Sequence, residues 1–392
     1  MVQIIDKNVN LEFPLGHHLH CMVAQIPNRL RKVDHGFVLT DPEEKWAQIR
    51  SILELVIEGE GNLKKLHFLM LPEASLPFSC FDEILEILGK NFRPNTVTIF
   101  GVEPVRLHVY RGLLEHYRED NSDAIEIVDR DIEGGNVLEM PVNWCCIAIK
   151  EATGKLRVFL EAKSHPFHAE ELLDKYHDLY RGRHFYLFHS RPACFNFMAL
   201  ICLDYLYRDL YSSNIKQIID HANHLFFTTR QGLDAIFVIQ CNPKPEHNSY
   251  RDVVSGFYGE YLEDTPGVRE TVTVFGNSSD DTILEGISPT FGYGHSYVVI
   301  NRHHKVRKLT LKEFKTDDFN GAPICRLRFG AETRLYYFNI PPHHELDPRT
   351  SRMPLKLHSI MRWSDRGQWE KLPGEELGTE KMQAVLPEAL LQ

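Results

Sequence analysis

Long apolar runs and paired cysteines are both missing from this sequence of 392 residues. No stretch reaches the length that a membrane-spanning helix needs, and the first residues lack the basic start and apolar core of a signal peptide. The eight cysteines are scattered and include no Cys-x-x-Cys pair, which is more typical of reduced thiols than of a disulfide framework. These absences predict a cytoplasmic protein without a membrane partner.

An excess of positive charge is missing as well. The formal net charge is -10 at pH 7, which disfavours a sequence-independent grip on nucleic-acid phosphates. One basic stretch, RHHKVRKLTLKEFK at 302–315, stands against this trend. We interpret it as a solvated strand and loop rather than as a surface for nucleic acid or a partner. Nucleic acid is therefore not expected among the partners.

The 21 histidines do not form a metal-binding pattern. Adjacent histidines occur at 17–18, 303–304 and 343–344, but none is paired with a cysteine or a carboxylate at the spacing of metal ligands. We therefore expect no metal site, and we interpret these histidines as surface and loop residues.

Strand-like and helix-like segments alternate along the first part of the chain. Strands are expected at 19–27, 66–71 and 96–102, and helices are expected between them. The first of these helices should begin at Pro42 with Asp41 as its N-cap. Such alternation predicts an α/β fold.

Further strand-like runs continue to about residue 340 and favour one large domain at 1–341. Beyond it the chain is rich in proline and charge and has few periodic apolar positions. Residues 342–392 are therefore expected to form a polar extension outside the core, which could serve as an oligomerisation arm.

Three reactive side chains follow directly after apolar, strand-like runs. Glu73 follows HFLMLP, Lys163 follows LRVFLEA and Cys202 follows FMALI. Taken singly, each has an ordinary structural explanation, such as core packing for the cysteine. Together they supply complementary chemistry, because a carboxylate can remove the thiol proton and a cation can stabilise a developing oxyanion. The combination predicts a nucleophilic cysteine that performs acyl transfer.

The segments around these residues resemble the nitrilase superfamily, the carbon–nitrogen hydrolases with a Glu-Lys-Cys triad. CMVAQIP is similar to the family's first strand, and FLMLPEASLP to the strand that leads to its Pro-Glu dipeptide. NWCCIAIKEATGKLRVFLEAKSHPF is similar to the hairpin before the catalytic lysine, and FNFMALICLDYLYRDL to the strand and turn that carry the nucleophile. The order Glu, Lys, Cys is the family's, and the resemblance covers about residues 19–340.

The resemblance implies a four-layer αββα sandwich and a role for each residue of the triad. Cys202 is then the nucleophile at an elbow between strand and helix, and Glu73 is the general base. Lys163 binds the tetrahedral oxyanion, and the backbone N–H of Leu203 completes the oxyanion hole. The implied reaction needs neither a metal nor an organic cofactor.

Residues next to the triad receive roles as well. Many members of the family use a second glutamate shortly after the lysine; Glu171 is the best match, with Glu170 as the alternative. His165 is expected either at the pocket entrance or in a structural role. Asp204 is interpreted as a cap for the helix after the nucleophile rather than as a group that acts on substrate.

The resemblance thus implies hydrolysis of a small non-peptide amide or nitrile through a cysteine thioester, in a homodimer. The segment LDYLYRDL departs from the family's pattern, so the identity of the substrate stays open.

A function from another class is also compatible with this departure, with the basic stretch at 302–315 and with the extension at 342–392. In that alternative the chain is a nitrilase-fold interaction or effector module of a bacterial, defence-type multi-protein system, with little or no general amidase activity. Preferential alkylation of Cys202 over the other cysteines would favour the enzyme.

Overall fold

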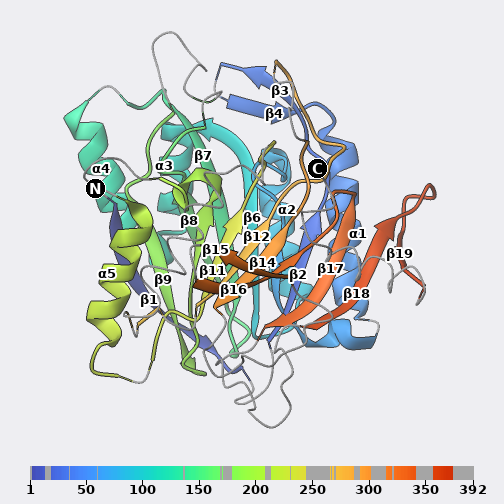
Figure 1. Cartoon of the computed structure of the whole chain (residues 1–392). Helices are drawn as coiled ribbons and strands as arrows, with labels where there is room; N and C mark the ends of the chain where they lie inside the picture. The colour runs from blue at the N-terminus through green and yellow to red at the C-terminus, as the bar shows by residue number, and fades with distance from the viewer. Residues whose placement is uncertain are drawn as a thin grey trace.

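The fold is taken from a computed structural model of the chain, shown in Figure 1. The structure describes residues 2–13, 19–34, 36–59, 61–135, 137–167, 170, 179–207, 213–229, 231–243, 265, 267–268, 271–286, 292–301, 315–319, 322–340 and 356–373. The basic stretch at 302–315 lies outside these residues except for Lys315, and so do the adjacent histidines at 17–18, 303–304 and 343–344.

The first large sheet has eight strands in the order β19-β18-β17-β2-β5-β6-β7-β8. Its strands are β2 (Leu19–Gln25), β5 (Leu66–Met70), β6 (Thr96–Arg106), β7 (Pro141–Lys150), β8 (Leu156–Ala162), β17 (Arg334–Ile340), β18 (Lys356–Trp363) and β19 (Trp369–Lys371). The strands β2, β5 and β6 run parallel to one another, as expected for strands separated by helices. The remaining neighbours in the sheet pair antiparallel.

The second large sheet also has eight strands, in the order β1-β9-β10-β11-β12-β14-β16-β15. These are β1 (Gln3–Leu11), β9 (His184–Pro192), β10 (Asn196–Ile201), β11 (Ala235–Ile239), β12 (Val272–Gly276), β14 (Tyr297–Asn301), β15 (Lys315–Phe319) and β16 (Ala322–Arg328). A third, small sheet has the order β13-β3-β4 and consists of β3 (Arg29–Val33), β4 (Gly36–Leu39) and β13 (Ile283–Leu284).

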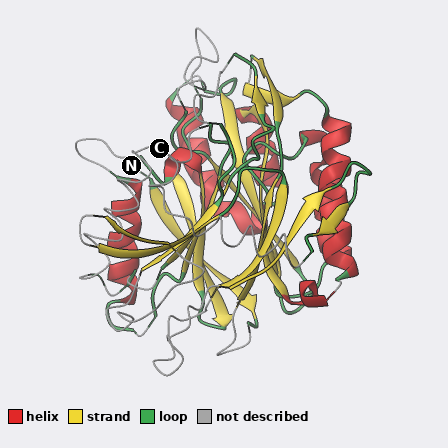
Figure 2. Cartoon of the chain, turned by 45° about the vertical axis from the view of Figure 1, so that its right-hand side comes forward, coloured by secondary structure: helices red, strands yellow, loops and turns green. Residues whose placement is uncertain are grey.

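The described helices lie against the two large sheets. They are α1 (Pro42–Glu58), α2 (Phe81–Asn91), α3 (Leu107–His116), α4 (Arg118–Gly134) and α5 (Asn214–Phe226), with the 3-10 turns η1 (Gly61–Lys65), η2 (Phe78–Cys80) and η3 (Cys202–Asp204). Helices α2, α3 and α4 contact strands of the first sheet, and α1 contacts β19. Helix α5 buries Ile215 and Ile219 in a cluster with residues of the second sheet. Figure 2 shows helices on opposite sides of the molecule, with the strands between them.

The two large sheets pack against each other through aromatic side chains. Phe68 on β5 stacks on Phe237 on β11 with ring centroids 4.6 Å apart, and Phe197 on β10 meets Phe68 edge to face. These side chains belong to one continuous core that includes residues of both sheets. The expected α/β fold is confirmed at this level. None of the described helices is both long and apolar enough to cross a membrane.

Helix α1 begins at Pro42, as the sequence predicts, and Asp41 occupies the N-cap position. The Asp41 side chain does not cap a helix amide, however; its Oδ2 accepts a hydrogen bond from the Thr40 hydroxyl at 2.9 Å. The start of the helix was therefore correct, and the capping contact was wrong.

Part of the segment expected as an extension outside the core continues the first sheet. Strand β18 pairs antiparallel with β17, and β19 pairs with β18. Leu357, Ile360 and Met361 are buried in the main core. A shift of register between Tyr337 and Phe338 interrupts the pairing. A bulge of this kind breaks the alternation of apolar and polar residues by which a strand is recognised in a sequence. The sequence of β18 therefore does not indicate a strand.

Candidate functional site

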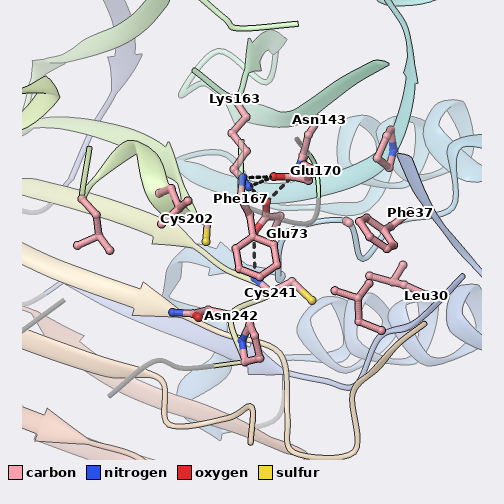
Figure 3. A pocket seen from close by; sticks show the side chains of 16 residues that line it. Leu30, Phe37, Glu73, Asn143, Lys163, Phe167, Glu170, Cys202, Cys241 and Asn242 are labelled. Carbon is pink, nitrogen blue, oxygen red and sulfur yellow. Dashed lines mark hydrogen bonds and ion pairs between the residues drawn. The ribbon is translucent and has the colours of Figure 1, made fainter. Parts of the chain in front are cut away.

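Glu73, Lys163 and Cys202 line one pocket of about 230 Å³ (Figure 3). The described residues that line it are Leu30, Phe37, Glu73, Ala74, Pro104, Asn143, Lys163, Phe167, Glu170, Cys202, Leu203, Leu206, Cys241, Asn242, Pro243 and Leu284. The structure therefore brings together the three residues of the expected triad, and Leu203 with them. They come from the ends of β5, β8 and β10, so both large sheets contribute to the site.

Glu73 lies just after β5 and is 4% exposed. Its Oε1 accepts hydrogen bonds from Lys163 Nζ at 2.7 Å and from Asn143 Nδ2 at 2.8 Å. Its Oε2 accepts the backbone N–H of Cys241 at 3.0 Å, and its own carbonyl accepts Asn28 Nδ2 at 2.8 Å. Both carboxylate oxygens are thus held in place by donors from three other elements or loops.

Gly101 on β6 allows the backbone of Glu73 to come this close to the sheet. A Cβ atom at position 101 would lie 2.5 Å from Glu73 Cα and 2.5 Å from the backbone nitrogen of Ala74. The chain also turns sharply here, because Ala74 adopts a left-handed conformation with φ 51°. Only glycine fits at position 101 without displacing the candidate base.

Lys163 follows β8 and is 1% exposed. Its Nζ lies 2.7 Å from Glu73 Oε1 and 2.7 Å from Glu170 Oε2, so the ammonium sits between two carboxylates. Burial alone would lower the pKa of Lys163, but the negative charges of Glu170 and Glu73 outweigh it and hold that pKa well above its usual value. Lys163 is therefore a permanent cation at physiological pH.

Glu170 is the second glutamate that binds the ammonium of Lys163. Besides Lys163, it binds Asn143 Nδ2 through Oε1 at 2.5 Å and the backbone N–H of Phe167 through Oε2 at 2.7 Å. Glu170 was the alternative in the sequence-based prediction, while the preferred residue, Glu171, lies outside the described residues.

Cys202 is the first residue of η3 and forms a sharp elbow directly after β10. It has φ 47°, a left-handed backbone conformation that side chains other than glycine rarely adopt, and it is 3% exposed. Strain of this kind persists where the surrounding fold imposes it, and it is typical of positions that present a nucleophile at the top of a strand. Figure 3 shows its sulfur directed into the pocket, on the side where Lys163 and Glu73 lie.

Asp204 connects the elbow to the loop that follows Lys163. Its Oδ1 accepts the backbone N–H groups of Ser164 at 2.9 Å and His165 at 3.0 Å, and the Ser164 hydroxyl at 2.7 Å. Burial raises the pKa of Asp204 to about 7, although the hydrogen bonds from Ser164 and the charge of Lys163 oppose this shift. The expected helix cap is therefore wrong for this oxygen, which instead joins the turn at Cys202 to the loop after Lys163.

His165 takes part in the same connection. Its Nδ1 lies 2.7 Å from the Ser164 hydroxyl, and its ring stacks on that of Tyr207. His165 is not among the described residues that line the pocket. Of the two roles expected for it, these contacts favour the structural one.

Cys241 is a second thiol in the pocket. Burial, followed by the charge of Glu73, raises the pKa of Cys241 to about 11, and its sulfur lies 3.6 Å from the Ser278 hydroxyl. Cys241 therefore stays protonated near neutral pH, where a protonated thiol is a poor nucleophile.

Sequence reasoning missed the two further donors to the Glu73 carboxylate, the Asn143 side chain and the Cys241 backbone N–H. Asn143 is the third residue of β7, which is buried along its whole length, so a single amide there gives no periodic signal. The hairpin that resembles the family's begins at this asparagine, which is the one cue that could have identified it.

Among the described residues, no three His, Cys, Asp or Glu side chains gather as a metal site requires. Comparison with known proteins adds no assignment: neither a scan against protein-family models nor a search of curated proteins gives a match to this chain.

Proposed function

We propose that the chain is a carbon–nitrogen hydrolase that cleaves a non-peptide amide or nitrile through a thioester on Cys202. One observation carries this proposal: Cys202, on a left-handed elbow, shares a pocket with an ammonium held 2.7 Å from each of two buried carboxylates. Core packing of the thiol would need neither the elbow nor the adjacent charges. An activated nucleophile benefits from both.

In the proposed reaction Glu73 removes the thiol proton of Cys202, and the thiolate forms a bond to the amide carbon. The carbonyl π electrons move to oxygen, where the resulting negative charge is stabilised by Lys163. When the carbonyl re-forms, the carbon–nitrogen bond breaks and Glu73 gives its proton to the departing ammonia or amine. The acyl group remains on sulfur as a thioester.

A water molecule then completes the cycle. Glu73 accepts a proton from the water, whose oxygen bonds to the acyl carbon, and the carbon–sulfur bond breaks. The thiolate of Cys202 recovers its proton from Glu73, so enzyme and charge return to the starting state. A nitrile would first give a thioimidate, which takes up water and releases ammonia to reach the same thioester.

Two further groups support the proposed intermediate. Leu203 is the second residue of η3, and a backbone N–H in the first turn of a helix has no acceptor within that helix. We propose that the backbone N–H of Leu203 and the ammonium of Lys163 both stabilise the oxyanion. Glu170 is a positioning residue, because it acts on the lysine: its Oε2 accepts a hydrogen bond from the ammonium, and it shares the Asn143 amide with Glu73.

We also propose that the fold is the four-layer αββα sandwich of the nitrilase type. The contacts of α2, α3 and α4 with the first sheet and of α5 with the second support this arrangement, as do the aromatic contacts between the sheets. A homodimer built partly by residues after 341 belongs to the same proposal.

The proposal is tested by the alkylation rates of individual cysteines. Near neutral pH, iodoacetamide should modify Cys202 faster than Cys241, which lines the same pocket, and faster than Cys194, which is half-buried elsewhere. Peptide mapping by mass spectrometry measures the three rates in one experiment. Replacing Cys202 by Ala should abolish ammonia release from an amide panel, whereas Cys241→Ser should retain it. Equal rates at the three thiols would remove the main support for the enzyme.

A further inference from the structure

We infer that the acyl group of the substrate is uncharged and apolar, of about six carbon atoms, and that the small sheet β13-β3-β4 forms its binding wall. This inference rests on the proposed hydrolase function and assigns a substrate class to it. Its evidence is separate, because it comes from the apolar lining, the charge balance and the volume of the pocket rather than from the position of Cys202.

The small sheet presents apolar side chains to the pocket. Leu30 on β3, Phe37 on β4 and Leu284 on β13 all line it and are 3%, 6% and 7% exposed. Leu30 and Leu284 are direct partners in the parallel pairing of β3 with β13, so their side chains lie next to each other. All three residues belong to an apolar cluster distinct from the main core, whose other buried members are Leu39, Ala74, Leu179 and Tyr293. A cluster that borders a pocket instead of filling the core provides a surface for a ligand.

The wall is fixed to the catalytic carboxylate through Asn28. The carbonyl of Asn28 accepts the backbone N–H of Ile283 at 2.8 Å, and its side chain donates to the carbonyl of Glu73 at 2.8 Å. On the other side, Glu103 on β6 accepts the backbone N–H of Leu39 at 2.6 Å. The wall therefore has a defined position relative to the reacting atoms, as a specificity element needs.

The charges of the pocket disfavour an anionic substrate. Its charged lining residues, within the described part of the chain, are Glu73, Lys163 and Glu170, which sum to one negative charge when ionised. The ammonium of Lys163 is already bound to both carboxylates. Among the described lining residues no other cation is present, so a substrate carboxylate placed against Leu30 and Phe37 would lose its hydration without a new ionic partner there, which is unfavourable.

The volume limits the size of the acyl group. An apolar cavity of about 150 Å³ accommodates benzene. The pocket, at about 230 Å³, has room for an amide group and a branched aliphatic chain or one ring. The volume therefore matches an acyl group of about six carbon atoms.

Three isosteric amides test this inference: 4-methylpentanamide, succinamide and succinamate. They have nearly the same shape, and their far ends are apolar, polar and neutral, and anionic. We expect kcat/KM for 4-methylpentanamide to exceed that for succinamide by at least about tenfold, the discrimination that a small apolar group provides. We expect succinamate to be slower still. Equal or faster hydrolysis of succinamate would overturn the inference and leave the proposed function standing.

A matched pair of variants assigns the preference to the wall. Leu30→Ala should reduce kcat/KM for 4-methylpentanamide by about tenfold relative to acetamide, which is too short to reach the wall. Arg31→Ala changes the next residue of the same strand, whose exposed side chain does not line this pocket, so it should leave that ratio unchanged. If the ratio of kcat/KM for 4-methylpentanamide to that for acetamide is the same in both variants and the wild type, the small sheet does not contribute to specificity.

Alkylation separates a failure of the inference from a failure of the proposed function. If no amide is hydrolysed, the proposed function fails, but the pocket can still be probed with neutral iodoacetamide and anionic iodoacetate. The inference predicts that the rate ratio of iodoacetamide to iodoacetate is at least about tenfold larger at Cys202 than at Cys194. Equal ratios at the two thiols would contradict it.

Discussion

Lys163 and Glu73 form a buried ion pair in which Nζ lies 2.7 Å from Oε1 and the two residues are 1% and 4% exposed. An ion pair in an open, hydrated site could be removed with little consequence for folding. This pair is buried, so removing the lysine leaves two buried carboxylates without a cation. The same contact therefore bears on stability and on the proposed chemistry.

The first prediction concerns Lys163→Met. This change leaves the carboxylates of Glu73 and Glu170 facing each other without a cation, so the free energy of unfolding should fall by about 3–5 kcal/mol. The folded-state pKa of Lys163 is raised, so its stabilising contribution is fully present below the pKa of an unfolded lysine and is lost only when the pH rises through the higher folded value. At pH 7 the wild type therefore has the full contribution of Lys163, and Lys163→Met should show the full decrease in the free energy of unfolding.

Urea unfolding of wild type and variant at pH 7 measures this effect. Lys155→Met provides the control, because Lys155 pairs with Glu119 on the surface, where such pairs contribute about 0–1 kcal/mol. A similar, small loss in both variants would show that the buried ion pair does not stabilise the fold.

The second prediction separates the two glutamates. Glu73→Gln removes the proposed base and should lower kcat by about 10²–10⁴-fold, with the fold retained, because Lys163 and Glu170 then balance in charge. Glu170→Gln leaves the base in place and should lower kcat less, since Glu170 acts on the lysine. Steady-state kinetics with 4-methylpentanamide distinguish them. A larger loss of kcat in Glu170→Gln than in Glu73→Gln would reverse the assignment of roles.

A third prediction uses the close approach of two backbones. Gly101→Ala would place a Cβ 2.5 Å from Glu73 Cα, so the base must move. Since a displacement of about 1 Å can reduce a rate by about 10²-fold, kcat should fall by that order, with a stability loss of about 1–3 kcal/mol. Gly112→Ala on α3 meets nothing within 4 Å and should preserve activity. Full activity in Gly101→Ala would refute the packing argument.

The fourth prediction follows from Asp204, whose pKa is raised from 3.8 to about 7 by burial. A raised folded-state pKa means that its contribution to stability is fully present below pH 4 and is lost as the pH rises to 7. Asp204→Asn cannot titrate. The stability of wild type relative to this variant should therefore fall between pH 4 and pH 7, by up to about 4 kcal/mol.

Urea unfolding at intervals of pH measures that difference. Asp220→Asn, at an exposed position on α5, should instead parallel the wild type across the range. If the curve of Asp204→Asn is also parallel to the wild type, Asp204 does not titrate in this window.

The fifth prediction concerns β18. Ile360 is 1% exposed, so Ile360→Ala should destabilise the protein by about 2–5 kcal/mol, as measured by urea unfolding. A polar extension outside the core would give a change near zero. Deleting residues after 341 would remove β18 and β19 with the tail, so a point change is the cleaner test.

The sequence was most informative where function depends on local order along the chain. Lys163 and Cys202 follow a buried strand directly and Glu73 follows one within three residues, and a strand end delivers the next side chains to an edge of the sheet. Their convergence could therefore be expected from three short segments. The small wall could not, because β13 meets β3 across some 250 residues of sequence.

Other features depend on side-chain direction in loops and on tertiary contacts. Glu170 and Glu171 are adjacent, and no periodic pattern in the loop after Lys163 tells which one faces the lysine. Asp204 follows a turn where helix capping is the common local solution, yet its partners, Ser164 and His165, are about 40 residues away in sequence. Contacts of this kind are decided by packing between the two sheets.

The central claim is that Cys202 is the nucleophile, and trapping its acyl-enzyme tests that claim most directly. Wild-type protein mixed with 4-methylpentanamide and quenched in acid should carry the acyl group on Cys202 by peptide mass spectrometry, and hydroxylamine should release it as the hydroxamate. Cys241→Ser should give the same adduct and Cys202→Ala none. Ammonia release by Cys202→Ala at the wild-type rate, or an acyl group carried on another residue, would contradict the account.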